Sequence, residues 1–210
     1  RLIATCLKGL GLLHRRFNDA GRAIDLLISA TDAFGALGNT LEQARCLESM
    51  GQVEESRGDL SAAVKNYEAS ATRLEETRSQ HIPVDYRRRF WTDNISLFDK
   101  LSRAHWQTDD FAGALASSER GKGRTIHDLM TSRGIESDRF NPAPMSFEQI
   151  RELAGRVSRH LVLLRVTADG TFAFTVAPSG NLDTVEAPGF TAKRLEELAM
   201  RSVQDTMEQR

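Results

Sequence analysis

The sequence has only two cysteines, Cys6 and Cys46, among its 210 residues. As a pair they fit neither a disulfide framework nor the ligand spacing of a zinc site. Both lie within apolar patterns of helical spacing, so we predict two buried structural thiols. The sequence therefore offers no cysteine suited to a metal site or to nucleophilic catalysis.

The sequence also lacks an excess of either charge and any long apolar run. Its 28 Lys and Arg against 29 Asp and Glu give a net charge of −1, which argues against a nucleic acid or a membrane surface as partner. No apolar run approaches the roughly 18–20 residues of a membrane span, and no signal peptide is visible. We predict a soluble, cytoplasmic protein. Because Arg1 and Arg210 both fall inside helical patterns, we also expect the chain to be a segment of a longer protein.

Apolar residues at 3–4 residue spacing predict four helices in the first half of the chain, over 1–16, 23–34, 41–53 and 60–71. Polar breaks at Asn18-Asp19, Gly38-Asn39 and Gly58-Asp59 separate them. Thr40 with Gln43 predicts a capping-box start for the third helix.

These helices form a repeat in which the second pair comes 40 residues after the first. Gly11 and Ala23 recur as Gly51 and Ala63, and a third copy falls on Ser102 and Ala114, a further 51 residues on. The added length lies around 79–93, where we expect both helices to be elongated. Periods near 40 with a small residue at each helix crossing are typical of helical-hairpin solenoids.

The spacing of Leu10-Gly11, Ala23 and Ala30 resembles a tetratricopeptide (TPR) repeat, as does that of Met50-Gly51, Gly58-Asp59, Ala63 and Tyr67. The third copy keeps Asp110-Phe111 and Ala114, so the resemblance covers residues 1–132. In TPR arrays the first helix of each pair lines a concave groove that binds peptides.

In each copy, the residues three before, one after and four after the crossing position (Gly11, Gly51 or Ser102) would face that groove. They form the candidate partner-binding set. They are Lys8, Leu12, Arg15, Glu48, Gln52, Glu55, Asp99, Arg103 and Trp106. The set is mixed in charge, unlike the Lys- and Asn-rich carboxylate clamp of chaperone-binding TPRs. It would suit a peptide of alternating charge or an internal segment of the parent protein; the alternative is a solvated face without a ligand.

A helix over 109–130 is predicted to join the repeats to a second domain. Asp109 and Asp110 would cap it, and Ala114 and Ser118 would pack on the preceding helix. Ile126, Leu129 and Met130 continue the same apolar face of the helix two turns later, and we expect them to contact the second domain.

The composition changes after residue 132. Residues 133–145 are predicted to be a linker, because they carry Gly134, Pro142 and Pro144. In 146–210, Ser146 with Gln149 predicts a capped helix, and two β-rich runs around Asp169-Gly170 predict a hairpin. The first run is apolar on both faces, so we expect layers on both sides. We also predict a short strand over 183–187 and a helix over 191–210.

This order resembles the entry into a CHAT domain, a caspase-like module that comes after TPR arrays. The matching residues are Glu119-Arg120, Lys122, Arg124 and Asp128-Leu129 in the joining helix, with Leu161–Thr167 and Phe172–Val176 in the hairpin. In that family the catalytic His and Cys come later, beyond this chain.

The predicted fold is therefore mainly α: a TPR-like helical-hairpin solenoid followed by a truncated, caspase-like α/β segment with a β-hairpin. We expect no catalytic residue, cofactor or metal site within the chain, and no nucleic acid or membrane partner. The function predicted is a protein-interaction and regulatory segment of a TPR–CHAT protein, whose parent is a caspase-like cysteine endopeptidase. The alternative is a non-enzymatic TPR adaptor.

Overall fold

A computed structural model describes residues 1–122, 145–166, 170–187, 189–191 and 193–194 of the chain. The chain divides into two compact units, Arg1–Pro144 and Met145–Arg210. The described part is mainly helical, with one small antiparallel sheet in the second unit.

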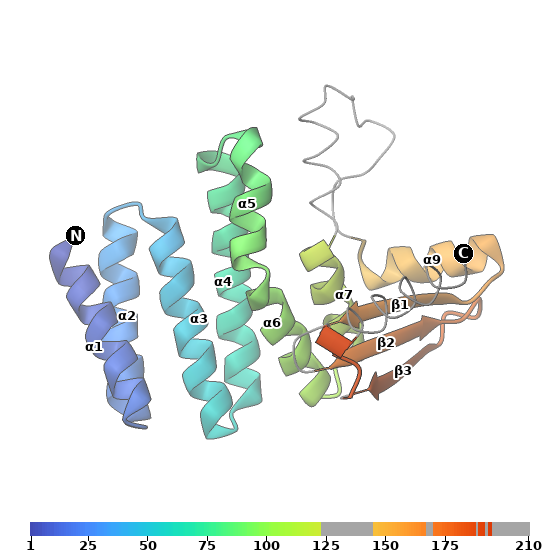
Figure 1. The fold of residues 1–210 in the computed structure, drawn as a ribbon, viewed down its shortest axis with the longest axis horizontal. Helices are drawn as coiled ribbons and strands as arrows, with labels where there is room; N and C mark the ends of the chain where they lie inside the picture. The colour runs from blue at the N-terminus through green and yellow to red at the C-terminus, as the bar shows by residue number, and fades with distance from the viewer. Residues whose placement is uncertain (123–144, 167–169, 188, 192, 195–210) are drawn as a thin grey trace, which may run out of the picture. The chain divides into compact units, whose positions relative to one another are not determined.

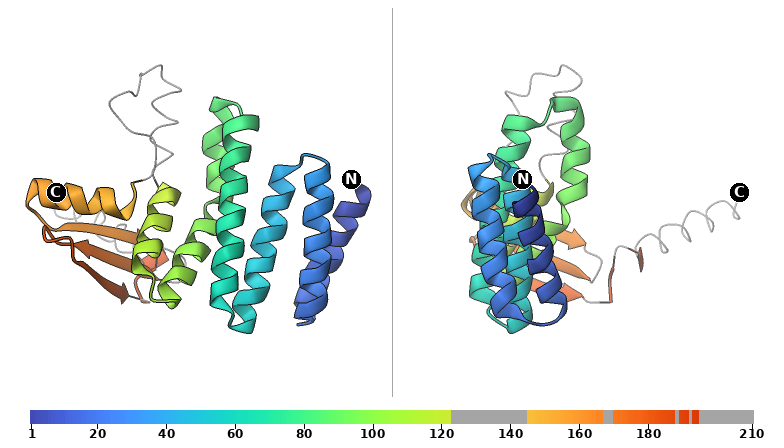
Figure 2. Two further views of the ribbon diagram at one scale, coloured as in Figure 1. Left: turned by 180° about the vertical axis from the view of Figure 1, so that it is seen from behind. Right: turned by 90° about the vertical axis from the view of Figure 1, so that its left-hand side faces the viewer.

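The first unit contains seven described helices that follow one another in space as in the sequence (Figures 1 and 2). Their bounds are α1 Leu2–Arg16, α2 Ala20–Ala36, α3 Thr40–Arg57, α4 Leu60–His81, α5 Val84–Asn94, α6 Ser96–Gln107 and α7 Phe111–Lys122. The main packing pairs are α1 with α2, α3 with α4, and α6 with α7, and the pairs are joined through α2 with α3 and α4 with α6. We call α1, α3 and α6 the first helices, and α2, α4 and α7 the second helices.

Asp or Asn side chains begin four of these helices. Asp19, Asn39, Asp59 and Asp110 each accept a hydrogen bond from the backbone N–H three residues later, at the starts of α2, α3, α4 and α7. The capping box predicted at Thr40 and Gln43 is therefore wrong: Asn39 already occupies the capping position. Thr40 instead shares a 2.7 Å hydrogen bond with the Thr77 hydroxyl, and Gln43 donates to the Thr31 carbonyl of α2.

The helix crossings repeat with the period seen in the sequence. A Cβ on Gly11 would come 2.8 Å from Leu27 Cγ, and a Cβ on Gly51 would press into the ring of Tyr67, which is 40 residues after Leu27. Only glycine permits these close approaches, since the facing groups are buried. In the third pair Ser102 takes this place, and its hydroxyl donates a 2.8 Å hydrogen bond to the Ala114 carbonyl.

The added length between the second and third pairs is distributed differently from the prediction. Helix α4 is elongated to 22 residues. The second elongated helix is interrupted at Ile95, which divides it into α5 and α6. Trp91 of α5 is buried against Phe98 of α6, with ring centroids 4.7 Å apart, and its indole N–H donates to the Gly121 carbonyl of α7 at 2.9 Å. This contact fixes α5 to α7, the last helix described in the unit.

Helix α7 is the described part of the predicted joining helix. Asp110 caps it, whereas Asp109 precedes it with a φ of 59°. Ala114 and Ser118 are fully buried, as the predicted packing on the preceding helix requires, and α7 packs on α6. Ile126, Leu129 and Met130 lie outside the described residues, as do linker residues 133–144, so the predicted reach to the second unit stays a prediction.

The second unit begins with α9 Phe147–Val157, which has the predicted capping box between Ser146 and Gln149. A meander of three strands comes next, β1 Leu161–Val166, β2 Thr171–Val176 and β3 Leu182–Ala187, with β2 in the centre. The predicted hairpin pairs Leu161 with Val176 and Val166 with Thr171. Both the hairpin and the third strand are thus confirmed; most of the helix predicted over 191–210 lies outside the described residues.

One face of this sheet is covered and the other is partly open. Helix α9 packs on β2, and Ile150 and Ala154 of the helix are buried, as are Phe174 and Val176 of the strand. On the opposite face Val162, Leu164 and Val185 are 64%, 53% and 63% exposed. Within the residues that the structure describes, the layer expected on this second side of β1 is therefore not found.

Candidate functional site

The predicted partner-binding residues lie on the three first helices, and several of them connect neighbouring first helices directly. Lys8 of α1 forms an ion pair with Glu42 of α3, and Lys100 of α6 forms one with Glu48 of α3. Because these pairs bridge α1 to α3 and α3 to α6, their side chains lie where successive first helices adjoin.

A third pair lies further along α3 and α6. Arg103 Nη2 of α6 is 3.4 Å from Glu55 Oε1 of α3, and the other oxygen of Glu55 accepts a 2.6 Å hydrogen bond from the Tyr67 hydroxyl. Burial, followed by the hydrogen bond and charge of Glu55, raises the pKa of Tyr67. We call the pairs Lys8–Glu42, Glu48–Lys100 and Glu55–Arg103 the ion-pair ladder.

The remaining predicted residues lie on the same three helices as the ladder. The Gln52 amide is 3.5 Å from the Glu48 carboxylate, at the outer limit of a hydrogen bond. Trp106 meets the ring of Phe111 edge-on, with centroids 5.1 Å apart. Leu12, Arg15 and Asp99 are partly buried. The structure thus places Lys8, Glu48, Gln52, Glu55 and Arg103 in polar contacts within or between adjacent first helices.

Sequence reasoning missed two members of the ladder, Glu42 and Lys100. Both carry a charge opposite to that of a predicted residue in a neighbouring repeat copy, which is a signal for an ion pair. To assign each partner, one must know how far adjacent helices are offset along their axes, and the sequence does not give that offset. Burial alone would raise the pKa of Glu42, yet the hydrogen bonds and charges of Lys8 and Arg45 outweigh it and hold that pKa below its ordinary value. Glu42 is therefore an ionised, half-buried carboxylate held between two cations.

The ladder can exchange partners with a charged ligand. Its side chains are 18–34% exposed, so their ion pairs contribute only up to about 1 kcal/mol each. A ligand that brings its own ammonium and carboxylate groups can replace such pairs at little free-energy cost, whereas a ligand of one charge leaves half of the ladder unmatched.

A second cluster of ionisable groups, which the sequence did not predict, holds the α6–α7 pair to α4. His105 of α6 has its Nδ1 2.8 Å from Asp110 Oδ2 and its Nε2 3.5 Å from Glu68 Oε1. Arg120 of α7 reaches the other Glu68 oxygen at 2.6 Å and Glu75 at 3.3 Å. We call Glu68, Glu75, His105, Asp110 and Arg120 the His105 cluster; it gives Arg120 a structural contact within the first unit.

The His105 cluster favours the charged forms of its members. Burial opposes protonation of His105, but Glu68 and Asp110 outweigh it and raise its pKa above the ordinary 6.5. Burial likewise opposes ionisation of Glu68, but His105 and Arg120 outweigh it and lower the pKa of that carboxyl below 4.5. The cluster is therefore most stabilising when His105 is protonated and Glu68 is ionised.

We expect the first unit to be more stable at pH 6 than at pH 8.5, and His105→Gln to reduce that difference. The contribution of a histidine whose pKa is raised on folding is complete below its unfolded pKa of about 6.5 and is lost as the pH rises through the folded value. The contribution of Glu68, whose pKa is lowered, is present above its unfolded pKa of about 4.5 and is lost as the pH falls through the folded value. Urea midpoints measured by circular dichroism from pH 4 to 9 test both limits.

The matched control is His14→Gln. His14 occupies the position of His105 in the first pair, with its Nδ1 3.1 Å from the capping Asp19, and it separates the effect of His105 from that of losing any histidine. Equal urea midpoints for the unsubstituted chain at pH 6 and 8.5 would contradict the expected role of His105.

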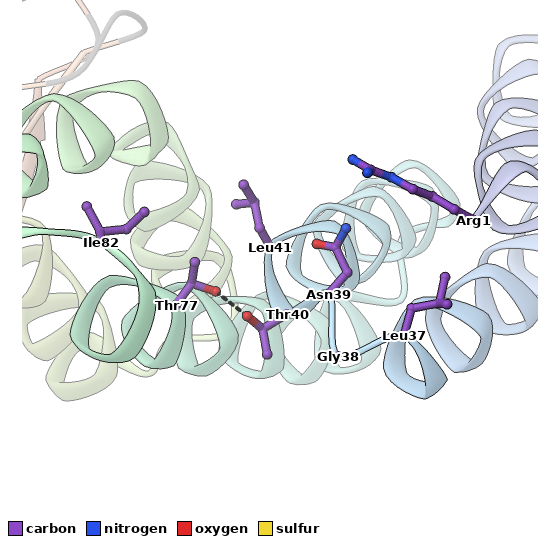
Figure 3. Close-up of a pocket in the computed structure, with 8 residues that line it drawn as sticks. All are labelled: Arg1, Leu37, Gly38, Asn39, Thr40, Leu41, Thr77 and Ile82. Carbon is purple, nitrogen blue, oxygen red and sulfur yellow. Dashed lines mark hydrogen bonds between the residues drawn. The ribbon is translucent and has the colours of Figure 1, made fainter.

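A separate open hollow lies at the turn between α2 and α3, next to the end of α4 (Figure 3). It measures about 470 Å³, and its lining residues are Arg1, Leu37, Gly38, Asn39, Thr40, Leu41, Thr77 and Ile82. In Figure 3, Leu41 lies between Ile82 on one side and Arg1 on the other, and the Thr40 and Thr77 hydroxyls share a hydrogen bond. Among the described lining residues only Arg1 has an ionisable side chain, so these residues offer no constellation for catalysis or metal binding.

The two cysteines differ, contrary to the prediction that both are buried. Cys46 is fully buried, and its burial raises the pKa of the thiol to about 11, whereas Cys6 is exposed on α1. In the part of the chain that the structure describes, no three His, Cys, Asp or Glu side chains are placed to hold a metal ion. Nor is any described helix long and apolar enough to cross a membrane.

Comparison with models of known protein families gives no match, and neither does comparison with curated proteins. The resemblance to TPR and CHAT domains therefore stays a prediction, and a function for the chain has to be inferred from its own geometry.

Proposed function

We propose that the first unit is a TPR-like solenoid whose first-helix face binds a protein segment of alternating charge. The observation that carries this proposal is the ion-pair ladder, which aligns cations and anions from three successive first helices. It is supported by the 40-residue recurrence of the close crossings at Gly11 and Gly51. Helices that each pack on the next present their equivalent positions in a row, which suits an extended ligand.

We further propose that the second unit begins a caspase-like CHAT domain, which makes the chain the regulatory part of a cytoplasmic TPR–CHAT protein. Helix α9 followed by an antiparallel hairpin fits this interpretation. The adaptor alternative predicts no peptidase. The sequence of the parent gene beyond Arg210 separates the two: a His at one strand end followed by a Cys at another supports the peptidase, and a stop codon supports the adaptor.

Peptides that bind the unsubstituted chain can be selected from a displayed library of 12-residue peptides. Replacing Glu48, Glu55 and Asp99 with Lys should abolish binding of these peptides. The three reversals remove every acidic side chain of the predicted binding set and leave Glu42 of the ladder in place. Binding by the unsubstituted chain should weaken from 50 to 500 mM NaCl, because the attraction between exposed charges is screened. Peptide affinity is measured by fluorescence anisotropy, and helicity by circular dichroism.

Two control variants make the result specific. Asp25, Asp32 and Asp93 are exposed and lie on α2 and α5, so reversing them changes the net charge equally and should leave binding intact. The double variant Glu48→Lys with Lys100→Glu preserves an ion pair but inverts its direction. It should fold normally and change the selected charge pattern. Selected peptides that bind the triple reversal as tightly as the unsubstituted chain would disprove the proposed binding face.

A further inference from the structure

Helix α1 carries an apolar stripe that faces solvent. The stripe consists of Ile3, Cys6, Leu10 and Leu13 of α1 and of Phe17, the residue directly after its end; all five are exposed, with Ile3 and Phe17 both at 75%. Spacings of 3, 4, 3 and 4 residues place them along one side of the helix. This side differs from the one that holds the buried Ala4 and Gly11, which packs on α2. We call these five residues the α1 stripe.

The internal repeat shows which kind of surface such a stripe contacts. Forty residues after Ile3, Cys6, Leu10 and Leu13 come Gln43, Cys46, Met50 and Val53 of α3. These four face α2: Gln43 donates to the Thr31 carbonyl, Cys46 and Val53 are fully buried among α2 side chains, and Met50 packs against the same cluster. The same positions are therefore covered on α3 and uncovered on α1.

The surface that covers them on α3 is defined by α2. Leu27 and Phe34 of α2 are completely buried in the cluster that includes Cys46 and Val53, with Ile24 packed at its edge. The apolar stripe of α1 matches that of α3 in spacing and is richer in aliphatic side chains, since Ile3 and Leu10 stand where α3 has Gln43 and Met50. A helix with the apolar pattern of α2 thus has the shape and chemistry that the α1 stripe requires.

We propose that the α1 stripe is a docking surface for a partner helix from outside residues 1–210 that presents the apolar pattern of α2. The precedent within the chain is the α2–α3 interface: the partner helix would pack on α1 as α2 packs on α3. This surface is distinct from the ladder face, so the inference holds whether or not the ladder binds a ligand. Burying four or five such side chains supplies a driving force of the size that joins one pair of helices to the next.

The test grafts a model of the partner onto the chain and uses Cys6 as the reporter. A copy of residues 19–40 placed directly before Arg1 reproduces the register of α2 with α3, because Arg1 corresponds to Leu41. The ungrafted chain should react rapidly with a maleimide at Cys6 and slowly at Cys46. The graft should slow the reaction of Cys6 at least about tenfold and increase amide protection in α1.

The control graft carries aspartate in place of the copied Leu27 and Phe34, and should leave Cys6 as reactive as in the ungrafted chain. Equal Cys6 rates for the two grafts would overturn the proposal. So would a dimer of the ungrafted chain in sedimentation, with Cys6 protected and both properties lost in Leu13→Asp, because the occupant would then be a second copy. A monomeric chain with reactive Cys6, protected only by the intact graft, supports the partner helix.

Discussion

Replacing Tyr67 with alanine should destabilise the first unit by about 3–5 kcal/mol, which is among the largest effects expected of any single substitution in this chain. Tyr67 is completely buried, its ring fills the space left by Gly51, and its hydroxyl bonds to Glu55. Truncation therefore leaves a cavity at the crossing of α3 and α4 and removes a hydrogen bond from the ladder. Urea unfolding followed by circular dichroism measures the change.

Two further variants divide this effect into its parts. Tyr67→Phe keeps the ring and loses the hydroxyl bond, so it should cost about 1 kcal/mol. Tyr86→Ala removes a tyrosine that is 66% exposed and should change stability by no more than about 0.5 kcal/mol. If Tyr67→Ala behaved like Tyr86→Ala, the close crossing at Gly51 would not be a main element of the core.

Trp91→Ala should have a comparable effect, about 3–5 kcal/mol, centred on α5 and the α6–α7 pair. The indole is buried against Phe98, and its N–H donates to the Gly121 carbonyl. Its loss opens a cavity between α5 and α6 and leaves a buried carbonyl of α7 without that donor. Hydrogen exchange should show lost protection in α5 and at the end of α7 before it does so in α1 and α2.

Trp91→Phe tests the hydrogen bond separately. It retains much of the ring contact and should cost about 1–3 kcal/mol through the unsatisfied Gly121 carbonyl. Trp106→Phe is the control, because Trp106 is only partly buried. If Trp91→Ala instead lost amide protection equally in all helices, Trp91 would support the whole unit and not mainly α5 and the α6–α7 pair.

The elements of the fold were largely predictable because their signals are local. Helical periodicity located α1 to α4, and the 40-residue recurrence of Gly11 as Gly51 identified the crossings. The strand pairing was indicated by two β-rich runs on either side of an Asp-Gly sequence. The misassigned cap at Thr40 is a one-residue error, in which Asn39 offered the stronger acceptor.

The side-chain partners were not predictable, because they depend on how one helix is offset from the next. The apolar spacing of Cys6 equals that of Cys46, yet only Cys46 is covered by a neighbouring helix. His105 lies between Glu68 and Asp110 because α4 and α7 both meet α6 there, and nothing close in the sequence marks Glu68 as its partner. The predicted binding set named four of the six ladder residues but not Glu42 or Lys100.

The packing order of the first unit also bears on how the chain folds and unfolds. Its main contacts join helices adjacent or nearly adjacent in the sequence, α1 with α2 through α6 with α7, so few contacts close long loops. Short-range topology of this kind allows rapid folding that can begin at any helix pair and spread to its neighbours. Unfolding can then proceed by fraying from an end, and a single midpoint would describe an average over pairs of unequal stability.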